Sequence, residues 1–186
     1  MRYNCVIPLA LLWFFISFSA SAQSPEPSLD LKYFLSVHSG ALFGKNAPSF
    51  SADLTQGLRY GRMRLGVGLG YDVYTDWRTM PLLASISWDV FHVRANSFFT
   101  QLGGGYSWIR SPLVRDGRPV YFYDGPNPCL TGVAGYRIHS GKYDVYLSAG
   151  YKFQRIRYGA TQQWSMIETR VQMDVESMTV KIGFGI

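Results

Sequence analysis

Cysteine is almost missing from this chain. The 186 residues contain only Cys5 and Cys129, and Cys5 lies in a leader segment that we expect to be removed. A single remaining cysteine cannot form a disulfide within the chain. We therefore expect stability to come from side-chain packing or from a lipid environment.

Long apolar runs are also missing. No stretch after residue 22 has 18 uninterrupted apolar residues, which excludes a transmembrane helix from that part of the sequence. The apolar run over residues 6–18 is shorter than the ~20 residues that a spanning helix needs. It ends near Ala20-Ser21-Ala22, a small-residue pattern typical of a secretory cleavage site. We predict a signal peptide over residues 1–22, with an uncleaved anchor as the alternative.

Residues for metal and cofactor chemistry are sparse. The three histidines and the one cysteine left after the leader have no ligand spacing. The glycine-rich residues 66–70 lie inside a predicted strand with no helix after them, which excludes a phosphate-binding loop. We expect no metal and no cofactor. The net charge of +6 could indicate nucleic acid, but an exported protein rarely meets it, so anionic lipid headgroups are the expected partner.

What the sequence has in abundance is alternation with a period of two. In residues 178–186 the apolar and the polar or small residues fall on opposite faces, and the same pattern returns in seven earlier segments. A strand has this side-chain period. The eight predicted strands cover residues 32–42, 49–60, 63–74, 80–90, 97–109, 130–139, 142–157 and 175–186. The prediction is an all-β fold, an eight-stranded antiparallel up-and-down transmembrane β-barrel over residues 32–186, after a periplasmic leader over residues 23–31.

The apolar face is expected to point outward. It carries no charged residue in any of the eight segments, and its aromatic residues gather near the strand ends, as in the two girdles of outer-membrane barrels. The opposite face holds the charges and many glycines. Short connections follow the even-numbered strands, and the longest connections, residues 110–129 and 158–174, follow odd-numbered ones. This alternation predicts periplasmic termini, with the last strand pairing with the first.

The lumen charges are predicted to form an ion-pair network. An eight-stranded barrel is just wide enough for side chains to fill it, and mixed signs at similar depth can neutralise each other. The network expected in the periplasmic half consists of Arg59, Arg64, Asp89, Arg137 and Asp144. A gated polar path through the barrel is the alternative interpretation.

One long connection carries the candidate recognition residues. Arginines and aromatics lie together there, and both types are enriched at binding hot spots. The candidates are Arg115, Arg118, Tyr121, Phe122 and Tyr123. The expected ligand is an extracellular protein or glycan; alternatively, the aromatics fold back on the rim and the arginines meet lipopolysaccharide phosphates. Residues 166–175 alternate enough to extend the last strand, and both interpretations of them stay open.

Catalytic residues are not predicted. His38 and Ser39 are adjacent and so point to opposite faces of a strand, while His139 falls at the periplasmic end. A general base must lie within hydrogen-bond reach of its nucleophile, and no such pair is indicated. We expect a protein that is not an enzyme, with a lipid A-modifying barrel as an alternative.

The whole pattern resembles the small eight-stranded outer-membrane barrels, such as OmpX and the membrane domain of OmpA. It is most similar to the outer membrane protein beta-barrel domain group common in Bacteroidetes. The resemblance covers residues 29–186 and includes the tail at residues 180–186, which is similar to the strand read by the barrel-assembly machinery but ends in Ile186 rather than Phe. It implies insertion in a Gram-negative outer membrane, with membrane lipid, lipopolysaccharide and the barrel-assembly machinery as partners.

The function expected from the sequence is that of an integral outer-membrane barrel with a structural or surface-interaction role through its extracellular loops. Two alternatives stay open within the membrane, a narrow channel and a lipid A-modifying enzyme. A soluble periplasmic barrel similar to a lipocalin is the alternative outside it, because soluble barrels alternate in the same way with the apolar face inward.

Overall fold

The structure, a computed structural model, describes residues 31–44, 48–75, 77–110, 113–115, 118–122, 125–161 and 168–186. Leu31–Ile186 forms one compact unit. The regular secondary structure of the described ranges is β-strand. Within those ranges, no helix has the length and apolar character that crossing a membrane requires.

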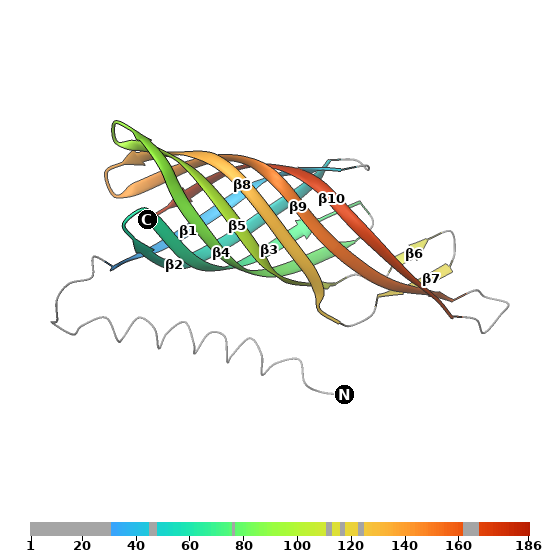
Figure 1. Ribbon diagram of the computed structural model, residues 1–186. Coiled ribbons are helices and arrows are strands. Elements are labelled where there is room, and N and C mark those ends of the chain that lie inside the picture. The colour runs from blue at the N-terminus through green and yellow to red at the C-terminus, as the bar shows by residue number, and fades with distance from the viewer. Residues whose placement is uncertain are drawn as a thin grey trace. The chain divides into compact units, whose positions relative to one another are not determined.

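Ten strands are present in the described residues, and eight of them close a barrel (Figure 1). These eight are β1 (Leu31–Phe43), β2 (Ser49–Tyr60), β3 (Met63–Val73), β4 (Arg78–Val93), β5 (Asn96–Ile109), β8 (Asn127–Ser140), β9 (Tyr143–Thr161) and β10 (Glu168–Gly185). Each strand pairs antiparallel with its neighbours. The predicted eight-stranded antiparallel barrel is therefore confirmed.

The barrel closes where β10 meets β1. Their register runs from Ser36 opposite Gly185 to Phe43 opposite Met178. The amide of Leu35 donates to the carbonyl of Ile186 over 3.1 Å, and the amide of Ile186 donates back over 2.9 Å. The seam predicted between the last and first strands is thus confirmed. Because a closed barrel has no free sheet edge along its wall, the backbone groups of the wall are satisfied internally.

The apolar residues face outward, as the alternation predicts. Large side chains such as Leu102 (66% exposed) and Phe184 (62%) stand on the outer surface, whereas Asp72, Asp89 and Arg137 are at most 1% exposed inside. A soluble barrel has the reverse distribution, because water outside would leave this apolar surface uncovered. The arrangement argues against the lipocalin-like alternative and fits a barrel whose outer wall contacts lipid.

Several predicted strand ends are wrong. The fourth connection is the two-residue turn Arg94-Ala95 rather than residues 91–96, because β4 continues to Val93 through a register shift between Asp89 and Phe91. A bulge of this kind adds one residue to a strand and lets two consecutive side chains stay on one face. Accordingly Val90 and Phe91 are both exposed.

The two longest predicted loops are also partly wrong, since they contain strands. The connection at residues 110–129 includes β6 (Leu113–Arg115) and β7 (Arg118–Phe122), which form a hairpin. β7 then pairs with the end of β9. In the connection at residues 158–174, β9 runs on to Thr161 and β10 begins at Glu168. Residues 168–175 are therefore a strand extension.

Two-residue turns join the strands at the opposite end of the barrel. They are Gly61-Arg62, Arg94-Ala95 and Gly141-Lys142, one residue later than predicted in the last case. The first residue of each has a positive φ, of 57°, 58° and 64° in that order. Glycine adopts this conformation freely, whereas a residue with a side chain is strained there. Only Arg94 among the described residues is a non-glycine with positive φ.

Replacing Arg94 by glycine is expected to stabilise the barrel. The substitution relieves the left-handed strain at a φ of 58°, and the free energy of unfolding should rise by about 0.5–1 kcal/mol. Urea unfolding in lipid vesicles, followed by tryptophan fluorescence, measures the change. Arg94→Ala is the matched control, because it removes the charge and keeps the strain. An equal gain in both variants would show that charge, not backbone conformation, sets the stability of this turn.

Candidate functional site

A buried ion-pair cluster fills the turn half of the lumen. Arg137 on β8 pairs with Asp89 on β4, reaching past β5, and both side chains are at most 1% exposed. Arg64 on β3 reaches across the lumen to β9, where Nη2 lies 3.2 Å from Oδ2 of Asp144 and Nη1 donates to the Tyr146 hydroxyl over 2.8 Å. Since β3 and β9 are four strands apart in an eight-stranded barrel, these bonds span its full width.

Aromatic rings pack against the two guanidinium groups. Arg137 lies 4.9 Å above the centroid of Phe99 and 5.1 Å from that of Tyr146. Arg64 lies 5.6 Å from the ring of Phe34. Such contacts stabilise cations that have lost water. Together the rings and ion pairs occupy the lumen of the barrel at this level.

Four of the five predicted network residues come together in this cluster, namely Arg64, Asp89, Arg137 and Asp144. Arg59 does not. Its Nε donates to the carbonyl of Gly61 over 3.2 Å at the exposed rim. His139 also belongs to this cluster, although the sequence did not predict it, because its Nδ1 pairs with Asp144.

The inward aromatics were also missed from the sequence. Phe99 follows Phe98, and Tyr146 lies between Val145 and Leu147 in an apolar run. In each case the signal was the position of the residue in the alternation along the strand, odd or even, because consecutive side chains point to opposite faces. Tyr146 shares its parity with Asp144, and that parity places it in the lumen.

A second cluster lies towards the loop end. Asp72 on β3 pairs with Lys152 on β9, again across the barrel. Its Oδ1 accepts from Ser51 over 2.7 Å, and its Oδ2 accepts from Thr79 over 3.2 Å. A buried carboxylate is stable when its oxygens are paired and hydrogen-bonded in this way. The cluster fixes β2, β3, β4 and β9 to one another.

A third cluster lies on β1, β2 and β10. Asp53 pairs with Lys181 through Oδ1 and with Nδ1 of His38 through Oδ2, the latter at 2.9 Å. The His38 ring meets Tyr146 edge-on at 5.1 Å. Its hydrogen bond goes to a carboxylate rather than to a hydroxyl nucleophile, and the group faces the lumen, away from lipid. This geometry supports packing and charge neutralisation.

Two small cavities remain between the clusters. One has a volume of about 50 Å³ and is lined by polar groups that include His38, Asp53, Asp72, Lys152 and Lys181. The other, of about 20 Å³, lies beside Arg64 and Arg137. A polar cavity of this size has room for a few water molecules. Among the described residues, no group of three or more His, Cys, Asp or Glu side chains is placed to hold a metal ion.

The predicted recognition residues fall on the β6–β7 hairpin rather than in a loop. Arg115 ends β6 and lies opposite Arg118, which begins β7. Tyr121 pairs with Gly159 of β9, and Phe122 with Tyr158. Tyr123 lies outside the described residues. The backbone thus places four of the five candidates on a short sheet at the loop end.

The loop end also carries an exposed ion pair between β9 and β10. Arg155 donates to both carboxylate oxygens of Asp174, over 2.8 Å from Nε and 3.1 Å from Nη2. This hydrogen bonding lowers the pKa of Asp174. The guanidinium lies 5.9 Å from the ring of Phe153. These contacts continue the β9–β10 pairing beyond the barrel wall.

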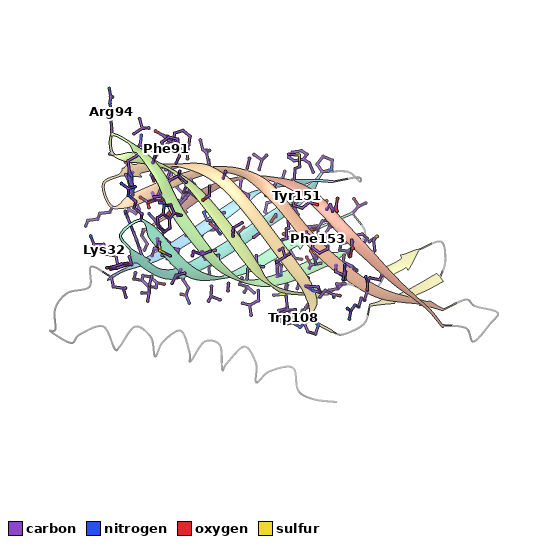
Figure 2. All side chains as sticks on the ribbon, in the orientation of Figure 1. Lys32, Phe91, Arg94, Trp108, Tyr151 and Phe153 are labelled. Carbon is purple, nitrogen blue, oxygen red and sulfur yellow. The ribbon has the colours of Figure 1, made fainter. Side chains whose placement is uncertain are left out.

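Aromatic side chains ring both ends of the outer wall. Figure 2 places Phe91 near the turn end, together with Lys32 and Arg94, and places Trp108, Tyr151 and Phe153 towards the loop end. At the turn end, Phe91 stacks on Phe98 with a centroid distance of 4.5 Å, and Phe98 packs against the tilted ring of Tyr136 at 4.6 Å. Two such girdles mark the membrane–water boundaries of an outer-membrane barrel.

Similarity to known proteins lies in the fold rather than in the sequence. No family model matches the chain, and no curated protein does. Among solved structures, the chain is similar to Neisserial surface protein A (NspA), with 14% identity and a TM-score of 0.59, over 84% of this chain and 97% of that one. A second similar structure is the outer membrane protein AlkL in lipid bilayers, with 10% identity, a TM-score of 0.48 and coverage of 88% and 94%.

The likeness to NspA concerns the fold. Both chains are small eight-stranded antiparallel barrels of the outer-membrane type. The exposed apolar belt and the two girdles of the present chain are independent physical evidence for the same environment, because such a surface is stable in lipid. The chain therefore has the fold of a small outer-membrane β-barrel, with an outer surface suited to lipid.

Proposed function

We propose that this protein is a closed, non-enzymatic outer-membrane barrel that acts at the cell surface through the sheet at its loop end. The observation that carries the proposal is the contrast between the two parts of the molecule. The lumen is crossed by buried ion pairs at two levels, whereas strands β9 and β10 continue beyond the wall at the loop end.

The packed lumen supports a role other than transport. A conducting path would have to pass the Asp89–Arg137 pair and the aromatic rings of Phe99 and Tyr146, all of which are buried. Separating a buried ion pair costs several kcal/mol. The cavities of about 50 and 20 Å³ hold water-sized spaces, which favours a structural core over a channel.

The projecting sheet supports surface interaction. β10 last pairs with β1 at Met178, so Glu168–Ser177 lies beyond the seam and pairs only with β9 among the described strands. β8 last pairs with β9 at Cys129, and β7 takes over at Tyr158. The sheet formed by β10, β9, β7 and β6 carries the arginines and aromatics typical of binding surfaces. We propose an extracellular protein or glycan as its ligand.

The proposal includes an orientation and a route. The loop end faces outward among lipopolysaccharide and the two-residue turns face the periplasm, as short turns do in this class. A signal peptide over residues 1–22 directs export, and the barrel-assembly machinery reads the last strand. Residues 23–31 then lie in the periplasm together with Ile186.

A hairpin replacement tests the proposed function. Residues 111–124, which include β6 and β7, are replaced by a short Gly-Ser linker, and heat-modifiable gel migration checks that the barrel still folds. Native and variant proteins are displayed on cells and probed with a glycan array and purified extracellular-matrix proteins. We expect at least one probe to bind the native protein tenfold better than the variant.

Planar-bilayer recordings complete this test. Both proteins are expected to give no conductance steps above background, because the ion pairs close the lumen in each. Regular conductance steps from the native barrel would favour the narrow-channel alternative. Equal binding of every probe by both proteins would contradict a role for the hairpin. A changed lipid A mass spectrum in cells with the gene would instead favour the lipid-modifying alternative.

A further inference from the structure

The charged side chains exposed in the turns of the barrel are all basic. Arg62, Arg94 and Lys142 each occupy one of the three two-residue turns, and all three are exposed. None of them forms an ion pair with another described residue. The described acidic side chains in this half, Asp89 and Asp144, face the lumen and are paired there.

The loop end differs, because its exposed charges are mixed. Asp174 and Glu176 stand there among the basic residues Arg78, Arg110, Arg155 and Arg157, and Asp174 is paired with Arg155. What distinguishes the turn end is that the charged side chains exposed in its turns are all basic.

The three basic turns are spread evenly around the rim. In the order of strands around the barrel, they join β2 to β3, β4 to β5 and β8 to β9, so each is separated from the next by two strands. The seam between β10 and β1 occupies the fourth position on the rim, and Lys32 lies beside it. A protein partner that docks from one side would need charge on one side. An annulus fits a partner that surrounds the barrel.

Exposed aromatic residues lie next to these basic turns in the sequence. Tyr60 precedes the turn of Arg62, Tyr143 follows Lys142, and their side chains are 55% and 61% exposed. Phe91 stands near Arg94 at the turn end (Figure 2). Tyrosine rings settle at the membrane–water boundary, and long basic side chains beside them reach the headgroup layer. The basic annulus thus lies at the depth of the lipid phosphates.

From this geometry we propose that Arg62, Arg94 and Lys142 form an annular binding site for anionic phospholipids, of the phosphatidylglycerol class, in the leaflet at the turn end. The inference rests on the proposed membrane insertion. Each basic side chain contacts a headgroup phosphate while the neighbouring aromatic ring packs on the upper acyl chain. Basic residues near a membrane surface attract anionic lipid in this manner. The annulus therefore enriches anionic lipid around the barrel.

Native mass spectrometry of the folded full-length protein tests this site. The protein in non-ionic detergent is titrated with phosphatidylglycerol or with zwitterionic phosphatidylethanolamine, and bound lipids are counted. We expect at least threefold more phosphatidylglycerol to be retained. The variant Arg62→Gln/Arg94→Gln/Lys142→Gln is expected to lose that preference. Glycerol phosphate at millimolar concentration should not displace the lipid; displacement would identify a free-phosphate site and overturn the lipid assignment.

The matched control neutralises three exposed arginines elsewhere, as Arg78→Gln/Arg110→Gln/Arg157→Gln. It changes the net charge equally and should keep the preference. Equal loss in both triple variants, or no preference in the native protein, overturns the proposal. Should the triple turn variant fail to fold, the three single variants test the proposal instead. Each of them must then lower the number of phosphatidylglycerol molecules bound. Cold gel migration monitors folding, so a folded barrel without lipid preference refutes this site and leaves the proposed function standing.

Discussion

Replacing Arg137 by methionine is expected to lower the free energy of unfolding by about 3–5 kcal/mol. The substitution keeps much of the side-chain volume and removes the charge. Asp89, which is fully buried, then loses the cation that pairs with it. The guanidinium contacts with Phe99 and Tyr146 disappear as well. Urea unfolding of the barrel in lipid vesicles, with gel migration as a second probe, measures the loss.

The double variant Asp89→Leu/Arg137→Met separates charge from packing. Removing both charges leaves no unpaired ion, so we expect most of the lost stability to return. Arg59→Met is the matched control, because the sequence assigned Arg59 to the same network and the structure places it at the exposed rim. It should change stability by less than about 0.5 kcal/mol. Additive losses in the double variant would contradict a coupled pair.

The difference between Arg59 and Arg137 illustrates what strand alternation can and cannot predict. Alternation assigns both side chains to the inner face, because a shift of one residue would expose every lumen charge to lipid. It does not say which charges meet. The bond from Arg64 to Asp144 depends on how eight strands are staggered around the barrel. That stagger is set by all the strand pairs together, and no single segment encodes it.

The wall itself was predictable because lipid imposes a strict pattern on it. The second strand was predicted at residues 49–60 and is observed at Ser49–Tyr60. The projecting strands were not predicted as firmly, since backbone hydrogen bonds hold them together beyond the membrane without a requirement for one apolar face. β7 illustrates this, because it pairs with β9 within a segment that we predicted to be a loop.

The bulge in β4 was missed for a related reason. Val90 and Phe91 are consecutive apolar residues, and strict alternation allows only one of them on the outer face. The sequence prediction therefore ended the strand at Val90. In the structure a β-bulge between Asp89 and Phe91 accommodates one extra residue, and Phe91 stacks on Phe98. The aromatic contact at the girdle stabilises a strand that the period-two pattern had ended.

Glycines on the inner face control how closely the strands can approach, and Gly150→Ala is the second substitution with a large expected effect. A Cβ at Gly150 would lie 2.1 Å from the carbonyl oxygen of Gly132 and 2.7 Å from the Cα of Val133. Both obstacles are backbone atoms of the paired strand, so β8 and β9 would have to move apart. We expect the free energy of unfolding to fall by about 3 kcal/mol.

Gly132→Ala is the matched control on the same strand pair. A Cβ there meets only the Cδ2 atom of Leu102, at 3.5 Å, which is an ordinary contact. The added methyl should be neutral or slightly stabilising, because glycine weakens a strand relative to alanine. Urea midpoints and the folded fraction on cold gels are compared for both variants. Equal effects would mean that glycine content alone matters. A large loss confined to Gly150→Ala would show that close approach of β8 and β9, forced by closing eight strands around a filled lumen, is what the inner glycines permit.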